Sequence, residues 1–125
     1  MIEIALSLTT FLLLTVGVME FGLAVYSYNF CNYASGEAAR WASVRGSQYV
    51  AEGNAAITQQ DVQNYVLGLA VGFSPSNFNV SLSMPDTNPG AVVGVTVAYT
   101  VVPLAGLALK QNIQISSTSQ KVIVH

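Results

Sequence analysis

Residues 3–47 read EIALSLTTFLLLTVGVMEFGLAVYSYNFCNYASGEAARWASVRGS and predict one continuous α-helix. The stretch contains no Pro, so nothing in it forces a helix to break. At about 1.5 Å per residue, a helix of this length extends roughly 67 Å, about twice the hydrocarbon thickness of a bilayer. Half of the helix is therefore expected to lie outside any membrane.

The first half of this stretch is apolar enough to sit in a membrane. Residues 4–19 carry no charge, and Glu20 is the only charged residue between Glu3 and Glu37. Extending the apolar window to Val25 gives the roughly 20 residues that a membrane span needs. Glu20 is then expected near one interface, because a carboxylate in the middle of a bilayer costs about 2.5–3.5 kcal/mol by insertion scales.

Small residues at helical spacing mark the second half of the helix. They form two adjacent stripes, which are Ala34, Ala38, Ala42 and Gly46 on one and Ser35, Ala39, Ser43 and Ser47 on the next. Such stripes let another backbone approach closely, either a sheet of the same chain or the helix of a second copy. We expect helix–sheet packing through Ala38 and Ala42, with Trp41 beside them as an anchor into the globular part.

Aromatic residues gather between the two halves, at Phe21, Tyr26, Tyr28, Phe30 and Tyr33. An interfacial belt is the first interpretation, because aromatic rings have apolar bodies and their hydroxyls stay hydrated. A chain of stacked rings that carries electrons along a filament is the alternative. The spacing of these residues does not favour that alternative.

A loop and a short helix are predicted after the long helix. Residues 48–57 contain Gly53 and Asn54 and are expected to form a loop. The segment from Thr58 to Asp61 then resembles a capping box. Apolar residues follow it at helical spacing, which indicates a short amphipathic helix.

Three strands are predicted in the rest of the chain. Apolar and polar residues alternate over 78–84, which indicates a strand with one hydrated face. The strand at 93–101 is apolar or small on both faces, so we expect it to be central. In the last strand, 113–124, the apolar positions change from odd to even numbers, for which a bulge or a bend would account.

Together these elements predict an α+β fold. A long N-terminal hydrophobic helix, residues 1–47, is expected to pack through its C-terminal half on a small surface domain, residues 48–125, with one short helix and a three-stranded antiparallel sheet. The surface domain is too short for a comfortable independent core. Residues 1–25, the most apolar part, would then project bare. A bilayer or a bundle of identical helices in a polymer would accept such a helix.

Composition favours a membrane or assembly protein. Charged residues make up 8% of the chain, against about 25% in ordinary soluble domains, and hydrophobic residues make up 52%. So little charge does not keep copies apart, and self-association is expected. The formal net charge of −2 leaves no basic patch, which argues against a nucleic-acid partner.

Motifs that would indicate an enzyme are absent from the sequence. The only histidine is His125, and the only cysteine, Cys31, lies in the apolar helix. The sequence contains no CxxC, HExxH, GxGxxG or P-loop pattern. We therefore expect no enzymatic activity, no cofactor and no metal site, and a Cys31 thiol that is buried rather than reactive.

Several segments resemble TadE-like pilins. Residues 19–28, MEFGLAVYSY, are similar to the "EFG…Y.Y" stretch of that family, and residues 34–42, ASGEAARWA, resemble its "AAREGARYA" signature. Residues 88–90, NPG, precede an alternating Val strand, and residues 103–107, PLAGL, precede the last strand, as in the family. The resemblance covers nearly the whole chain and indicates a TadE-like pilin or pseudopilin of a Tad-type pilus.

That resemblance implies a pilin-like fold and two successive locations. Members of the type IV pilin superfamily are made with a short leader that a prepilin peptidase removes. The N-terminal helix holds them in the inner membrane until the pilus assembly machinery extracts them into an extracellular helical filament on the cell surface. The family has an acid at the fifth mature position, after a cleaved Gly, and Glu3 corresponds to that acid here.

Assembly residues follow from these expectations. A carboxylate at the apolar end of a packed helix needs a partner, so we expect Glu3 to pair with the α-ammonium of Met1, in a neighbouring copy or in its own chain. The other predicted assembly residues on the helix are Phe11, Leu13, Glu20 and Phe21. The apolar connection after the central strand predicts a lateral contact through Pro103, Leu104 and Leu107.

The leading functional hypothesis is a structural subunit of an extracellular type IV pilus-like filament, or fimbrium. The subunit would be stored in the membrane, polymerise into a homo-oligomer through its apolar helix and serve cell adhesion. One alternative is a minor TadE-like pseudopilin that primes or caps a Tad pilus. A monomeric, membrane-anchored binding domain is the other.

Overall fold

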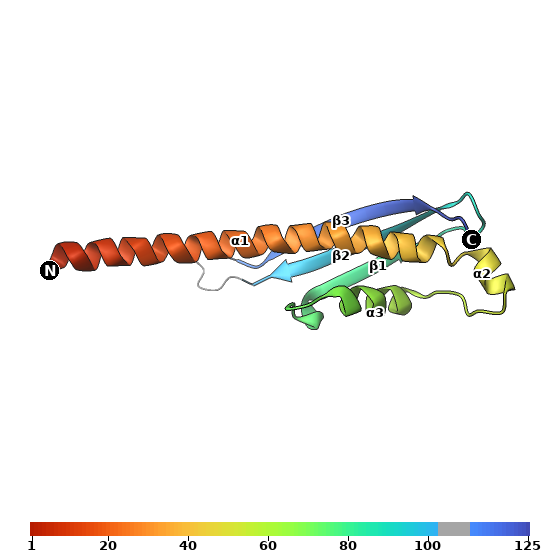
Figure 1. Cartoon of the computed structure of the whole chain (residues 1–125), viewed down its shortest axis with the longest axis horizontal. Coiled ribbons are helices and arrows are strands. Elements are labelled where there is room, and N and C mark those ends of the chain that lie inside the picture. The colour runs from red at the N-terminus through yellow and green to blue at the C-terminus, as the bar shows by residue number, and fades with distance from the viewer. Residues whose placement is uncertain (103–110) are drawn as a thin grey trace.

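The structure is a computed structural model that describes residues 1–102 and 111–125. Its elements in chain order are α1 (Ile2–Ser43), α2 (Ser47–Ala51), α3 (Gln59–Leu69), the 3-10 turn η1 (Pro75–Asn77), β1 (Phe78–Ser83), β2 (Val92–Val101) and β3 (Ile113–Val122). These elements confirm the predicted α+β fold with a long apolar N-terminal helix (Figure 1).

Helix α1 runs along nearly the whole length of the molecule (Figure 1). The hydroxyls of Thr9, Thr10 and Thr15 each donate a hydrogen bond to the carbonyl four residues earlier, so these three hydroxyls are satisfied within the helix. The sequence therefore builds an uninterrupted helix that exposes mainly hydrocarbon on this half.

The predicted end of the long helix is wrong by a few residues. α1 ends at Ser43, and the short helix α2 begins at Ser47, in a segment expected to be a loop from residue 48. The amide of Ser47 donates to the carbonyl of Thr87, and the amides of Gln48 and Tyr49 donate to the carbonyl of His125. Contacts with remote segments thus satisfy the first amides of α2, which local sequence patterns cannot reveal.

Helix α3 begins as predicted. Thr58 is its N-cap residue, and its hydroxyl accepts a hydrogen bond from the amide of Asp61. The Asp61 carboxylate accepts one in return from the amide of Thr58, at 2.8 Å, which completes the capping box. The helix buries Val62 and Val66 in the core.

The sheet has the order β1-β2-β3 within the described residues, and both pairings are antiparallel. β2 is therefore central, as predicted. β2 and β3 pair without interruption from Val101 opposite Ile113 to Val92 opposite Val122, so a bulge, one of the two explanations considered for the changed alternation, is wrong. The buried residue beyond β3 is Ile123, whereas its neighbour Val122 is exposed.

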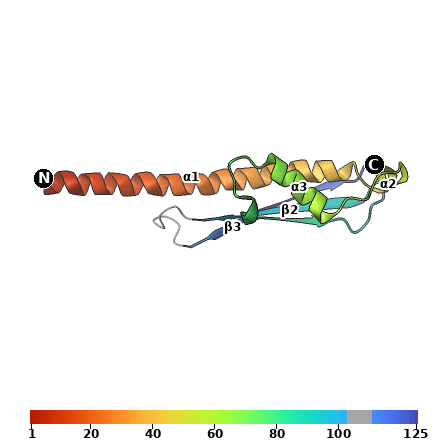
Figure 2. The same ribbon diagram turned by 90° about the horizontal axis from the view of Figure 1, so that it is seen from below.

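The long helix α1 and the short helix α3 cover one face of the sheet (Figure 2). α1 lies over β2 and β3, α3 lies over β1, and the two helices contact each other. The main core cluster joins Cys31 and Ala34 of α1 to Val66 of α3, Val80 of β1 and Val95 of β2. Only the second half of α1 takes part in this layer, and its first half projects beyond the sheet (Figures 1 and 2).

Candidate assembly surface

The first half of α1 carries apolar side chains on all of its sides. The most apolar window of 18 residues in α1 is entirely unburied in the part of the chain that the structure describes, and α1 passes for a membrane span by length and composition. A helix that is apolar all round needs cover from lipid or from other helices. This half of α1 is therefore the candidate functional surface, suited to membrane anchoring and to helix–helix contact.

Most of the predicted assembly residues lie on this surface. Met1, Phe11, Leu13 and Phe21 are exposed, with Leu13 48% and Phe21 66% exposed. Glu3 is exposed in the first turn of α1, where the positive end of the helix dipole favours an acid. Within the described single chain, the Glu3 carboxylate forms no ion pair with the Met1 ammonium. A partner for Glu3 would have to come from another molecule or from a different conformation of the N-terminus.

Glu20 differs from the other predicted assembly residues because it is buried, at 1% exposure. Its neighbours Met19 and Phe21 are exposed. Glu20 is the first buried residue of α1, and Ser27, two helical turns later, is the next. The residue thus lies on the face that α1 turns toward the sheet. It marks the boundary between the first half of α1, whose side chains are mainly exposed and which we call the bare half, and the second half, which packs on the sheet and which we call the packed half. The sequence predicted a position near a membrane interface for Glu20 and did not reveal its burial.

The helix–sheet contact uses the small residues. Ala38 and Ala42 are fully buried, the first in the main core cluster and the second in a cluster with Val93 and Ile123. Trp41 is half-buried and stacks on Tyr65 of α3, with ring centroids 5.2 Å apart. Small side chains on α1 bring its backbone close to the sheet, and Trp41 ties it to α3.

Polar contacts also join α1 to β3 at the helix–sheet interface. The hydroxyl of Ser35 donates to the hydroxyl of Ser117 at 3.4 Å, and Ser117 donates to the side-chain oxygen of Asn32. The thiol of Cys31 points to the carbonyl of Ile115, and burial raises the pKa of this thiol above its ordinary value. A raised pKa keeps the thiol protonated, which suits a packing residue rather than a nucleophile.

The aromatic cluster between the two halves divides into two groups. Tyr26 and Phe30 contact Phe73, which follows α3, with ring centroids 5.2 Å and 4.7 Å apart. Phe21, Tyr28 and Tyr33 are exposed, as Tyr26 is, but these three make no ring contact within the described residues. One group therefore fixes α1 to the end of the surface domain, and the other is free to form an interfacial belt.

Two other predictions concern lateral contact and metal binding. Pro103, Leu104 and Leu107, the predicted lateral contact, lie outside the described residues. Among residues 1–102 and 111–125, no three His, Cys, Asp or Glu side chains come together in a way that could hold a metal ion.

Comparison with known proteins gives a match over the N-terminal part of the chain. Residues 1–40 match the family model described as TadE-like protein. This match covers the bare half of α1 and most of its packed half, and it confirms the resemblance to TadE-like pilins over these residues. It supports a protein associated with a Tad pilus. Neither a curated protein nor a solved structure matches the chain.

Proposed function

We propose that this TadE-like chain is a structural subunit of an extracellular type IV pilus-like filament and has no catalytic role. The observation that carries the proposal is the first half of α1, whose apolar window is unburied within the described chain. The match of residues 1–40 to the TadE-like family supports it. The inner membrane would cover this helix before assembly, and the helices of other copies would cover it in the filament.

Burial of this helix against other copies would contribute a large hydrophobic free energy. Burying a few hundred Å2 of apolar surface per copy, at about 25 cal/mol per Å2, gives on the order of 10 kcal/mol. This is enough to offset the ordering of each subunit in the polymer. Transfer from lipid to a helix bundle gains less than transfer from water, so the proposal includes an assembly machinery that extracts the subunit, and a prepilin peptidase that processes it.

A minor pseudopilin is the second candidate. The family match fits it equally, because a subunit that primes or caps a Tad pilus needs the same helix to enter the filament. The two candidates differ in copy number rather than in the chemistry of α1. Abundance therefore separates them.

Sheared surface appendages of the source cells test the proposal. Electron microscopy would show the filaments, and quantitative mass spectrometry would measure the share of this chain in them. A structural subunit should be the dominant protein of a thin filament, and a pseudopilin should be a trace component. Confinement of the chain to the membrane fraction in piliated cells would contradict both and favour a membrane-anchored binding domain.

A further inference from the structure

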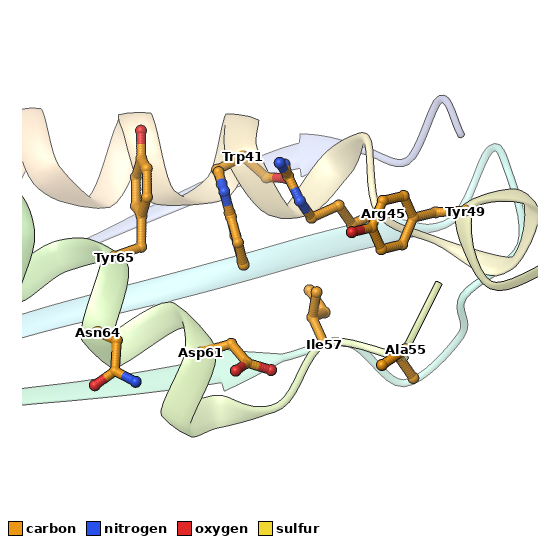
Figure 3. A pocket seen from close by; sticks show the side chains of 9 residues that line it. Trp41, Arg45, Tyr49, Ala55, Ile57, Asp61, Asn64 and Tyr65 are labelled. Carbon is orange, nitrogen blue, oxygen red and sulfur yellow. The ribbon is translucent and has the colours of Figure 1, made fainter. Parts of the chain in front are cut away.

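A groove lies where the end of α1 meets the surface domain, at the end of the molecule far from the N-terminus (Figure 1). Its volume is about 520 Å³, within the range of small-ligand sites. Its lining comes from the end of α1, α2, the segment before α3, and α3 itself (Figure 3). The residues are Trp41, Arg45, Tyr49, Ala55, Ala56, Ile57, Asp61, Asn64 and Tyr65.

One wall of the groove is a row of stacked planar side chains. Tyr65 stacks on Trp41 at an interplanar angle of 21°. The guanidinium carbon of Arg45 lies 4.2 Å from the centre of the Trp41 ring and 5.6 Å from that of Tyr49. Figure 3 shows the four side chains following one another along this wall. Each planar group restrains the next, so the wall presents Arg45 in a fixed orientation.

Among the described residues, no acid forms an ion pair with Arg45. One nitrogen of its guanidinium donates to the carbonyl of Trp41 at 2.7 Å, which caps the end of α1. In the part of the chain that the structure describes, no carboxylate lies within ion-pair distance of Arg45, whereas Arg40 pairs with Glu37 at 3.5 Å. The remaining N–H groups of Arg45 are therefore available to an anion, and a planar carboxylate suits their geometry.

The opposite wall offers hydrogen-bonding groups for hydroxyls. Asp61 uses one carboxylate oxygen to accept hydrogen bonds from the amide and the hydroxyl of Thr58, which leaves its other oxygen available. Asn64 accepts a hydrogen bond from Gln60 through its side-chain oxygen, which leaves its NH2 group available. Ile57 adds apolar surface between the two walls.

We propose that this groove binds an acidic saccharide, a sugar chain that carries carboxylates. A sugar carboxylate would receive hydrogen bonds from Arg45, and the ring hydroxyls would bond to Asp61 and Asn64. The C–H edges of the sugar would contact Ile57 and the aromatic rings. The Asp61 carboxylate disfavours a dense polyanion such as a polyphosphate, because it would repel that ligand across the groove. A polyol with isolated carboxylates meets both walls.

This site is independent of polymerisation. It lies at the opposite end of α1 from the bare half (Figure 1), and would stay accessible if that half were covered by lipid, detergent or other helices. The test can therefore use single subunits, and its failure would leave the proposed filament role untouched.

The test is isothermal titration of the full chain in detergent micelles with tetragalacturonate. Maltotetraose, a neutral tetrasaccharide, is the control ligand. We expect saturable binding of tetragalacturonate and much weaker binding of maltotetraose. No saturable binding, or equal binding of both ligands, would overturn the proposal.

Variants locate the site. Arg45→Gln removes the charge and should weaken binding about tenfold or more. Arg40→Gln is the matched control, because it removes an arginine near the end of α1 that lies outside the groove, and it should leave the affinity unchanged. Equal losses in both variants would point to nonspecific attraction between charges and overturn the proposal.

A second variant guards against a structural effect of Arg45→Gln, since Arg45 also caps α1. Asn64 is exposed, and Asn64→Ala leaves the stacked wall intact. We expect Asn64→Ala to weaken binding several-fold with an unchanged melting temperature. If Arg45→Gln does not fold, the Asn64→Ala result decides, and wild-type affinity in that variant would overturn the site.

Discussion

The two halves of α1 share one backbone and differ in what surrounds them. Over the first half, large side chains such as Leu6 and Phe11 are exposed on every side. Over the second half, small side chains such as Ala34 and Ala38 are fully buried against the sheet. Small side chains allow the chain's own sheet to pack close to the helix backbone. The large apolar side chains of the first half make no such contact and are available to lipid or to other copies. Side-chain size thus determines which half of α1 packs on the sheet and which half remains for contacts with other molecules.

A charge in the bare half should have the largest effect on assembly. Leu13→Lys would put an ammonium into lipid or into a helix bundle, which costs about 2.5–3.5 kcal/mol per copy by insertion scales. We expect no filaments from this variant. Ser81→Lys is the control, because Ser81 is exposed on the far side of the sheet from α1, and it should assemble normally. Filaments counted by electron microscopy give the result.

The membrane fraction must be measured in the same cells. If Leu13→Lys is absent from the membrane, the loss of filaments reports on insertion rather than on assembly. Equal filament numbers from Leu13→Lys and Ser81→Lys would mean that the bare half does not form the filament core. The membrane-anchored domain would then become the better interpretation.

Glu3 should have the next largest effect. The carboxylate is exposed in the single chain and would need a partner once other helices surround it. We expect Glu3→Ala and Glu3→Gln to enter the membrane normally and to give far fewer filaments, because both remove the charge that would pair with a Met1 ammonium. The amount of sheared pilus protein measures the effect, and a normal amount from Glu3→Ala would refute the pairing.

Sequence patterns could predict most of the fold because they are local. The capping box at Thr58 and the alternation around Val80 depend on neighbours in sequence, and both were found. The phase of β3 was not, because Ser117, which faces α1 in the middle of the strand, is small and polar, whereas Val122 and Val124 are apolar and yet exposed. Ser117 faces the helix instead, since close approach of the small-residue stripes leaves room for little more than a hydroxyl.

The candidate sites were harder to predict because they depend on tertiary contacts. The burial of Glu20 requires segments far from it in sequence, and no pattern around it indicates them. The groove had one usable signal, since Trp41, Arg45 and Tyr49 follow at intervals of four residues. Their partners Asp61 and Tyr65 are brought to the groove only by the packing of α3 on α1.

Two glycines, Gly17 in the bare half of α1 and Gly46 just after its packed half, test the difference in packing between the two halves. A Cβ added to Gly46 would lie 2.5 Å from the carbonyl oxygen of Thr87 and 2.5 Å from a methyl of Ile123. Gly46→Ala should therefore lower the free energy of unfolding by about 1–3 kcal/mol. A Cβ added to Gly17 would have no described atom within 4 Å apart from its chain neighbours and the adjacent backbone of its own helix, so Gly17→Ala should not destabilise the chain. Denaturant unfolding in micelles would measure the free energy of unfolding of both variants. Equal losses of stability would contradict the difference in packing between the two halves of α1.

Of these changes, removal of the bare half of α1 should have the smallest effect on the folding of the surface domain. The buried clusters begin at Cys31, so a fragment of residues 26–125 should remain folded, soluble and monomeric, with helix and strand signals in circular dichroism. A fragment of residues 19–125 retains the buried Glu20 and should unfold at a slightly higher temperature, because it keeps the interaction that Glu20 makes. If fragment 26–125 is unfolded while 19–125 is folded, the internal part of α1 begins at Glu20 rather than at Cys31. If both are unfolded, the sheet depends on neighbouring copies, and the division of α1 into internal and external halves fails.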